Sequence, residues 1–155
     1  MSAGHKNSVA LKSDGTVVAW GLNANGEANI PEDLKGVVAV SCAGEHSLAL
    51  KSDGTVVAWG DNSLINVPEG LKSVVAIAAG GSHNLALKSD GTVVAWGLNS
   101  NGQTNVPADL KGVVAIAAGS YHSLALKSNG TVVAWGDNRD GQTNVPTDLK
   151  LNPKQ

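Results

Sequence analysis

The chain has 155 residues, of which 42% are hydrophobic and 3% aromatic, and its formal net charge is −2. This length can bury a core without disulfides, and the single cysteine, Cys42, cannot form one within the chain. The small net charge offers no basic surface for nucleic acid or an anionic membrane, and no apolar run approaches the length of a membrane helix. We therefore expect one soluble domain over residues 1–155, with neither nucleic acid nor membrane as a partner.

The chain consists of four copies of one unit of 37 to 39 residues. Its tryptophans lie 39, 37 and 39 residues apart, each in the string Gly-Thr-Val-Val-Ala-Trp-Gly: Trp20, Trp59, Trp96 and Trp135. A fixed period of this size is typical of propellers and other repeat arrays. The approximate units are residues 1–41, 42–78, 79–117 and 118–155.

Each unit opens with an apolar segment, then Lys-Ser, then a pair of turn residues. The pairs are Asp14-Gly15, Asp53-Gly54, Asp90-Gly91 and Asn129-Gly130. Asp-Gly or Asn-Gly between β-prone runs predicts a hairpin with a two-residue type I′ turn, because glycine accepts the positive φ that this turn requires.

After each hairpin comes a polar connector, such as residues 97–107, and then a Val-Val-Ala strand. The second connector is two residues shorter than the others, which indicates a surface loop. The strands at 37–40, 74–77 and 113–116 are continuously apolar, which indicates burial on both faces. We therefore predict an all-β fold of propeller blades. A helical solenoid is disfavoured by the fixed Gly and Pro positions and the lack of a 3.6-residue period.

Two stretches carry a family resemblance: Ala-Gly-Ser-Tyr-His-Ser-Leu-Ala-Leu-Lys at 118–127 and Val-Val-Ala-Trp-Gly-Asp-Asn-Arg-Asp-Gly-Gln-Thr-Asn-Val-Pro at 132–146. They resemble the repeat of the regulator of chromosome condensation (RCC1-like) superfamily. The Gly-Gln-Thr-Asn-Val-Pro connector is most similar to the bacterial branch that includes the second β-lactamase inhibitory protein. The resemblance implies a propeller, commonly of about seven blades, that captures a partner with aromatic-rich loops on one face. Only Tyr121 is aromatic at the matching positions here, which argues against β-lactamase inhibition.

The four hairpins predict four blades, which is fewer than the family implies. We therefore expect something to cover the two end blades. An open arc would expose the apolar faces of its end blades, which monomers seldom tolerate. A closed four-bladed ring, a ring of about eight blades made by two chains, or excision from a longer parent would each explain the number. We favour the homodimer, because two-fold symmetry covers both ends. The alternative function is a self-assembling fragment with no ligand other than its own copies.

Three histidines at one repeat position raise the question of a metal-dependent enzyme: His46, His83 and His122. Equivalent positions on separate blades are spread around a ring, whereas metal ligands must converge. The first copy carries Asn7 there. We therefore expect each histidine to bond backbone in its own blade, and we expect neither a metal nor another cofactor.

The other candidates for chemistry also have structural explanations. Each tryptophan ends a strand and is expected in the core, and Cys42 aligns with alanines, as a small core residue would. The hairpin aspartates are replaced by Asn129 in the fourth copy, which indicates a turn role. The faint calcium-loop pattern at 137–141 fails, because Gly136 and Thr147 stand where carboxylates belong. We expect no enzyme.

Positions that differ between copies are the candidates for binding, because the shared positions are explained by building a blade. They form two loop series, one before and one after each hairpin: Glu45, Ser82 and Tyr121, and Leu22, Asp61, Leu98, Asp137, Arg139 and Asp140. The sequence thus predicts a non-catalytic module for protein–protein interaction, whether natural or engineered.

Overall fold

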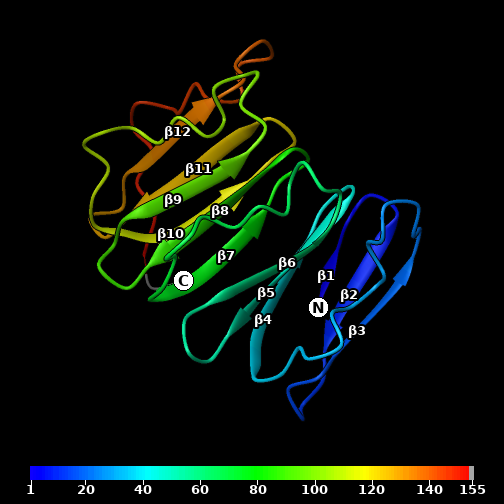
Figure 1. Ribbon diagram of the computed structural model, residues 1–155. Coiled ribbons are helices and arrows are strands. Elements are labelled where there is room, and N and C mark those ends of the chain that lie inside the picture. Colours follow the sequence, from blue (N-terminus) through cyan, green and yellow to red (C-terminus); the bar gives the residue numbers. More distant parts are fainter. Residues whose placement is uncertain (154–155) are drawn as a thin grey trace.

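The computed structural model describes residues 1–153 as four separate three-stranded antiparallel sheets. The strands are β1 (Ser2–Ala3), β2 (Asn7–Leu11), β3 (Val17–Gly21), β4 (Val37–Cys42), β5 (His46–Lys51), β6 (Val56–Gly60), β7 (Val74–Ala79), β8 (His83–Lys88), β9 (Val93–Gly97), β10 (Val113–Ala118), β11 (His122–Lys127) and β12 (Val132–Gly136). The sheets follow one another along an arc, with β1–β3 and β10–β12 at its two ends (Figure 1). This is the β-propeller blade architecture expected from the repeat.

Each sheet joins a Val-Val-Ala strand to the hairpin that follows it. β4 pairs along its length with β5, and β5 pairs with β6. The approximate unit boundaries at 41/42, 78/79 and 117/118 cut β4, β7 and β10 one residue before their ends, so the structure divides the chain differently. The blades are β1–β3, β4–β6, β7–β9 and β10–β12, numbered one to four below, because hydrogen bonding assigns each strand to the next hairpin.

The short blade is the first one. Its inner strand β1 has two residues, whereas β4, β7 and β10 have six each. After the fourth hairpin the Leu151 amide donates to the Gly130 carbonyl at 2.9 Å. Val74 and Val113 make the same bond to the preceding hairpin turn where β7 and β10 begin. Leu151 therefore occupies the position at which β7 and β10 begin in the preceding repeats.

The hairpin turns have three residues, not the predicted two. In the first, the Gly15 amide donates to the Lys12 carbonyl, and the Lys12 amide donates to the Thr16 carbonyl. Gly15 has a φ of 81°, and no residue in this turn other than the glycine has a positive φ. A type I turn followed by a left-handed glycine fits these bonds better than type I′. The predicted turn role of aspartate is confirmed, because Asp14 Oδ1 accepts from the Thr16 amide at 2.9 Å, and Asn129 does the same for Thr131.

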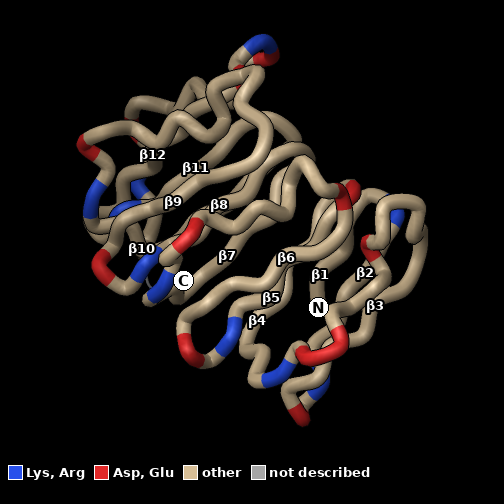
Figure 2. The backbone as a smooth tube through the Cα atoms, viewed as in Figure 1, with Lys and Arg blue, Asp and Glu red and all other residues tan. Residues whose placement is uncertain are grey.

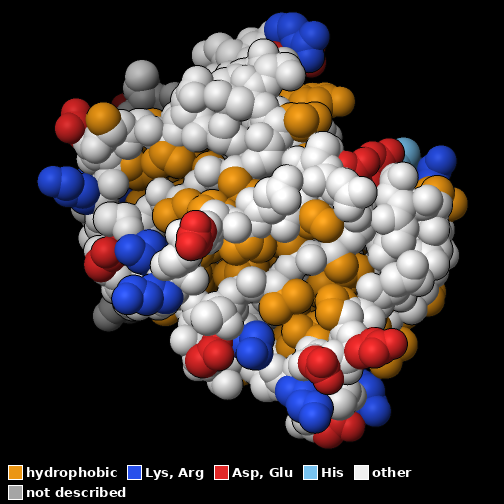
Figure 3. Space-filling model, in the orientation of Figure 1, with side chains coloured by type: hydrophobic (Ala, Val, Ile, Leu, Met, Phe, Trp, Pro, Cys, Tyr) orange, Lys and Arg blue, Asp and Glu red, His pale blue; other side chains and the backbone are white. Residues whose placement is uncertain are grey.

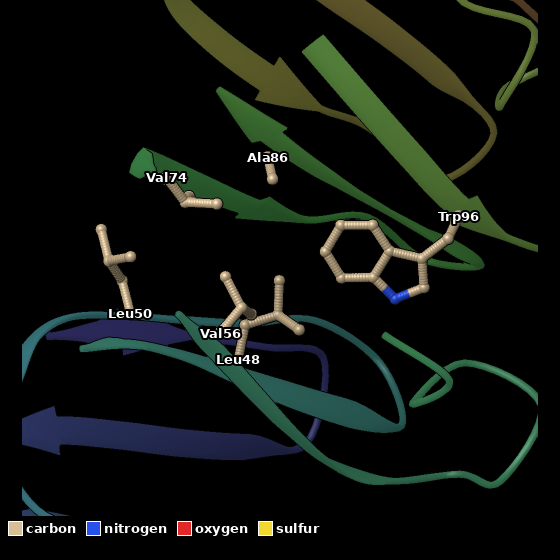
Figure 4. Packing of buried hydrophobic residues seen from close by; sticks show 6 residues of the cluster. All are labelled: Leu48, Leu50, Val56, Val74, Ala86 and Trp96. Atoms are coloured by element: carbon tan, nitrogen blue, oxygen red, sulfur yellow. The ribbon is translucent and has the colours of Figure 1, made fainter. Parts of the chain in front are cut away.

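Neighbouring blades pack through two kinds of face. The leading face of a blade meets the next blade, and in blade two it presents Leu48, Leu50 and Val56. The trailing face meets the preceding blade, and in blade three it presents Val74, Ala86 and Trp96. Figure 4 shows these two sets of side chains pointing toward one another across the gap between the sheets. The same arrangement recurs between blades one and two and between blades three and four.

The predicted burial of both faces was wrong for the Val-Val-Ala strands, because Val38, Val75 and Val114 are 53%, 54% and 44% exposed. Both faces are buried instead in the middle strands of the inner blades, where five of the six residues of β5 and of β8 are buried, whereas β2 and β11 alternate. Trp59, Trp96 and Trp135 are buried as predicted, but Trp20 is 52% exposed. That prediction was wrong for Trp20 because each tryptophan packs on the blade before its own. In Figure 3, hydrophobic side chains lie along the gaps between sheets and charged ones gather mostly toward the periphery.

The inner strands β1, β4, β7 and β10 neighbour one another around the inside of the arc. No comparable packing joins the first sheet to the last within residues 1–153, so the described arc is open and not a four-bladed ring. The hairpin turns lie at one end of every sheet, and the loops that precede the hairpins lie at the other. In Figure 2 most charged residues lie at turns and loops and few lie within strands.

Candidate functional site

Both series of divergent loop residues meet on one face of the arc, which we call the loop face. One backbone hydrogen bond of 2.8 or 2.9 Å joins them in each blade, from the residue after the hairpin to the residue before it. The pairs are Leu22 with Lys6, Asp61 with Glu45, Leu98 with Ser82, and Asp137 with Tyr121. The repeat thus places four variable pairs at equivalent positions along the arc.

All of these paired residues except Asp61 and Asp137 line an open hollow of about 970 Å³ on the inner side of the arc. Backbone and small side chains of the loops line much of it, because glycine or alanine begins every loop. Leu22, Leu98 and Tyr121 bring exposed apolar surface to its edge, at 43%, 45% and 47% exposure. Lys6 and Glu45 add charges of both signs. The hollow therefore combines an open concave shape with a lining of mixed polarity.

The fourth blade carries the most ordered polar cluster of the loop face. Arg139 Nε donates to Asp137 Oδ1 at 2.9 Å, and its Nη2 donates to Oδ2 at 3.0 Å. This two-point bond holds the pKa of Asp137 below its ordinary value and raises that of Arg139. The negative charge of Asp140 also favours the charged form of Arg139, and the Arg139 side chain is 73% exposed. An arginine fixed in this way can contact a partner at little entropic cost.

Two other predicted binding residues, Ser82 and Asp61, make hydrogen bonds within the chain. Ser82 is buried, donates to the Ser120 carbonyl at 3.1 Å and accepts from Gln103. Asp61 accepts from the Ser63 amide, and this bond and the one from the Ser63 hydroxyl lower the pKa of Asp61. Asp140 is exposed at the connector tip. Of the predicted set, Glu45, Tyr121, Arg139 and Asp140 are free to meet a partner. Lys6 was missed, although its position matches Tyr121 in the repeat.

His46 and His83 bond across blades, which corrects for these two the expectation that each histidine would bond backbone in its own blade. His46 Nε2 is paired with Asn84 Oδ1, and His83 Nε2 with Ser123 Oγ at 2.8 Å. Both partners lie on the trailing face of the next blade. Asn7 is not equivalent, because its shorter side chain is buried and its amide has no hydrogen-bond partner.

Within residues 1–153, no group of three His, Cys, Asp or Glu is placed to hold a metal ion. Cys42 is buried, as expected for a small core residue, and its Sγ lies 3.2 Å from the Ser2 carbonyl oxygen. The same residues include no helix with the length and hydropathy needed to cross a membrane.

The repeat defines the class of the chain. The family model described as the regulator of chromosome condensation (RCC1) repeat matches residues 1–27, 37–64, 74–103 and 113–142, well over half of the sequence. The chain belongs to this repeat family. The matched segments begin where the sheets begin and extend into the connectors, in agreement with the observed blades.

Solved structures share the fold at low sequence identity. Yeast RCC1 (Prp20), in a crystal structure bound to Kap60, is 21% identical with a TM-score of 0.79, over 97% of this chain and 46% of that one. The ectodomain of the Physcomitrella patens receptor kinase CR4 is 24% identical, with a TM-score of 0.79 over 94% and 43%. Human WBSCR16 is 23% identical, with a TM-score of 0.74 over 97% and 51%. This chain therefore spans about half the length of the structures that it matches. No curated protein matches the sequence.

Proposed function

We propose that the chain is a non-catalytic interaction module whose loop face binds a protein partner. The observation that carries this proposal is the cluster on blade four, where Tyr121 lines the hollow and its carbonyl accepts from the amide of Asp137, which is paired with Arg139. Tyrosine and arginine are enriched among residues that dominate binding energy at protein interfaces. Related folds also act as interaction proteins: one solved structure shows yeast RCC1 bound to Kap60, and a study of yeast Prp20p describes binding to Gsp1p and histones.

The basic side chains support a protein partner over nucleic acid or a membrane surface. On the hairpin turns Lys12, Lys51 and Lys88 are each within 4 Å of the aspartate two residues later. Such pairing leaves no uncompensated basic patch on these turns, and phosphate recognition depends on one. Closer placement in the bacterial branch with the β-lactamase inhibitory protein stays a prediction.

The test is capture of partners on the immobilised chain, followed by affinity measurement with each purified partner. We expect Tyr121→Ala with Arg139→Ala to weaken binding by roughly 30-fold or more. The matched control, Lys88→Ala with Asp90→Ala, alters the opposite face and should leave affinity unchanged. The proposal fails if the control variant loses binding while the loop variant keeps it.

A second element of the proposed function is pairing with another copy of the chain to complete a ring of about eight blades. The specific observation is the exposed trailing face of blade one, where Val18 and Trp20 are 45% and 52% exposed. Large apolar side chains grouped on one sheet face usually mark an interface. The competing function is self-assembly without any other ligand. The partner-capture experiment distinguishes it from partner binding, because a chain that only self-assembles captures no other protein through its loop face.

A further inference from the structure

The contacts between neighbouring blades within the chain show which groups pair across a blade interface. On the leading side, a histidine pairs with a serine or asparagine of the next blade, as His83 does with Ser123. On the trailing side, a tryptophan Nε1 donates to a connector carbonyl of the preceding blade. Trp59 donates to Glu27 at 2.8 Å and Trp135 donates to Gln103 at 2.9 Å.

The two ends of the arc present the two unmatched halves of this interface. Blade one shows Ser8 and Trp20 on its trailing face, at the positions of Ser123 and Trp135. Blade four shows His122 and Leu124 on its leading face, at the positions of His83 and Leu85. Leu85 is fully buried by blade four, whereas Leu124 is only partly covered. Gln142 holds the connector position of Gln103.

We infer that a second copy docks head to tail, so that the leading face of blade four in each copy covers the trailing face of blade one in the other. This inference rests on the proposed pairing and adds which residues of the two copies meet. His122 meets Ser8 of the second copy, and Trp20 of that copy donates to the Gln142 carbonyl. Two identical interfaces then close the ring around one two-fold axis. A second copy is the fitting occupant because it carries both halves of the repeated interface.

The strand pattern agrees with this register. The first blade lacks most of an inner strand, and residue 151 of the fourth blade already makes the hydrogen bond with which interior inner strands begin. In the head-to-tail arrangement, the start of that strand in one copy lies next to the short inner strand of the other.

The experiment uses native mass spectrometry of the whole chain and three variants, with circular dichroism to verify folding. Trp20→Glu alters the trailing face of blade one, and Leu124→Lys alters the leading face of blade four. Leu98→Glu is the matched control, because Leu98 is an equally exposed apolar residue on the loop face. We expect a two-chain species for the unmodified chain and the control, and single chains for the other two, with dissociation constants raised at least about 100-fold.

Mixing the two interface variants is the decisive experiment. A mixed pair has one unaltered interface, whereas each variant alone has none, so equimolar mixing should restore the two-chain species. If Leu124→Lys alone remains paired while Trp20→Glu does not, the Trp20 faces meet each other and the head-to-tail register is overturned, although pairing itself stands. If the unmodified chain is a single chain at every concentration, pairing fails as well. Partner binding at the loop face is measured separately and can survive either failure.

Discussion

His83 is a buried base between two blades, and this makes stability depend on pH. Burial first, and the neighbouring His122 and His46 next, lower its pKa from 6.5 to about 4. Burial also lowers the pKa of His46. The unfolded chain binds a proton at His83 near pH 6.5, but the folded chain binds it only near pH 4. The stabilising contribution is therefore present above pH 6.5 and is lost as the pH falls toward 4.

We expect the free energy of unfolding to fall by roughly 2 kcal/mol from this group between pH 7 and pH 4. Urea titrations at several pH values measure it. His83→Asn removes the titrating group and should make the curve flatter, even if the variant is less stable at pH 7. An unchanged slope in the variant would show that His83 does not titrate between these limits.

The buried tryptophans differ in one hydrogen bond. Trp59 Nε1 donates to the Glu27 carbonyl, but buried Trp96 Nε1 has no partner. The second connector, which Trp96 faces, is two residues shorter than the others, and its Leu64 carbonyl accepts from Asn84. An unmade buried bond costs stability and a made one contributes about 1 kcal/mol.

We expect Trp59→Phe to destabilise the chain by about 1 kcal/mol more than Trp96→Phe, since both lose similar packing and only one loses a bond. Chemical denaturation of the two variants measures this difference directly. A larger loss for Trp96→Phe would contradict the hydrogen-bond assignment.

At the scale of elements, the end of each outer strand requires glycine. Gly60 ends β6 with a φ of 114°, and a Cβ there would lie 2.5 Å from the Glu45 carbonyl oxygen. Gly70 has a φ of 75° but open space around it. The first site is restricted by both conformation and crowding, the second by conformation alone.

We expect Gly60→Ala to cost roughly 3 kcal/mol and Gly70→Ala about 1 kcal/mol, because only the first adds a backbone clash to the left-handed conformation. Thermal unfolding of the pair tests this. Equal losses of stability in the two variants would mean that the loop before β5 moves to accommodate the added Cβ, and would contradict this prediction.

The hairpins, the three Val-Val-Ala strands and the Asp or Asn turn role could be predicted from the sequence, because they depend on local chemistry that recurs in the copies. The short strand β1 was not predicted, because Ser2–Ala3 lacks the Val-Val-Ala string. The assignment of the Val-Val-Ala strands to the following hairpin could not, because hydrogen-bond pairing between separated segments leaves no local signal. Trp20 and the histidines were misjudged for a related reason: their partners lie on neighbouring blades, and identical strings give no sign that the first blade has no predecessor.

The two loop series could be recognised from the sequence by comparing the copies, and the structure joins them in pairs on one face. Their role in binding stays a prediction. Comparing the copies could not distinguish exposed Tyr121 from buried Ser82, since that depends on contacts with the next blade.

At the scale of the whole molecule, the described chain is an open arc whose two ends carry the halves of one repeated interface. Its internal interfaces are well formed, with buried leucine and tryptophan on either side, whereas Trp20 on the trailing face of blade one is exposed. Covering the two ends would account for the exposure of Val18 and Trp20 without any new type of contact.

The central claim is that a second copy completes the ring, and static light scattering of the unmodified chain over a range of concentrations tests it most directly. We predict a mass of twice the 15.6 kDa of one chain, with no larger species, because two head-to-tail interfaces close the ring. A mass of one chain throughout, or a mass that grows without limit as concentration rises, would contradict it.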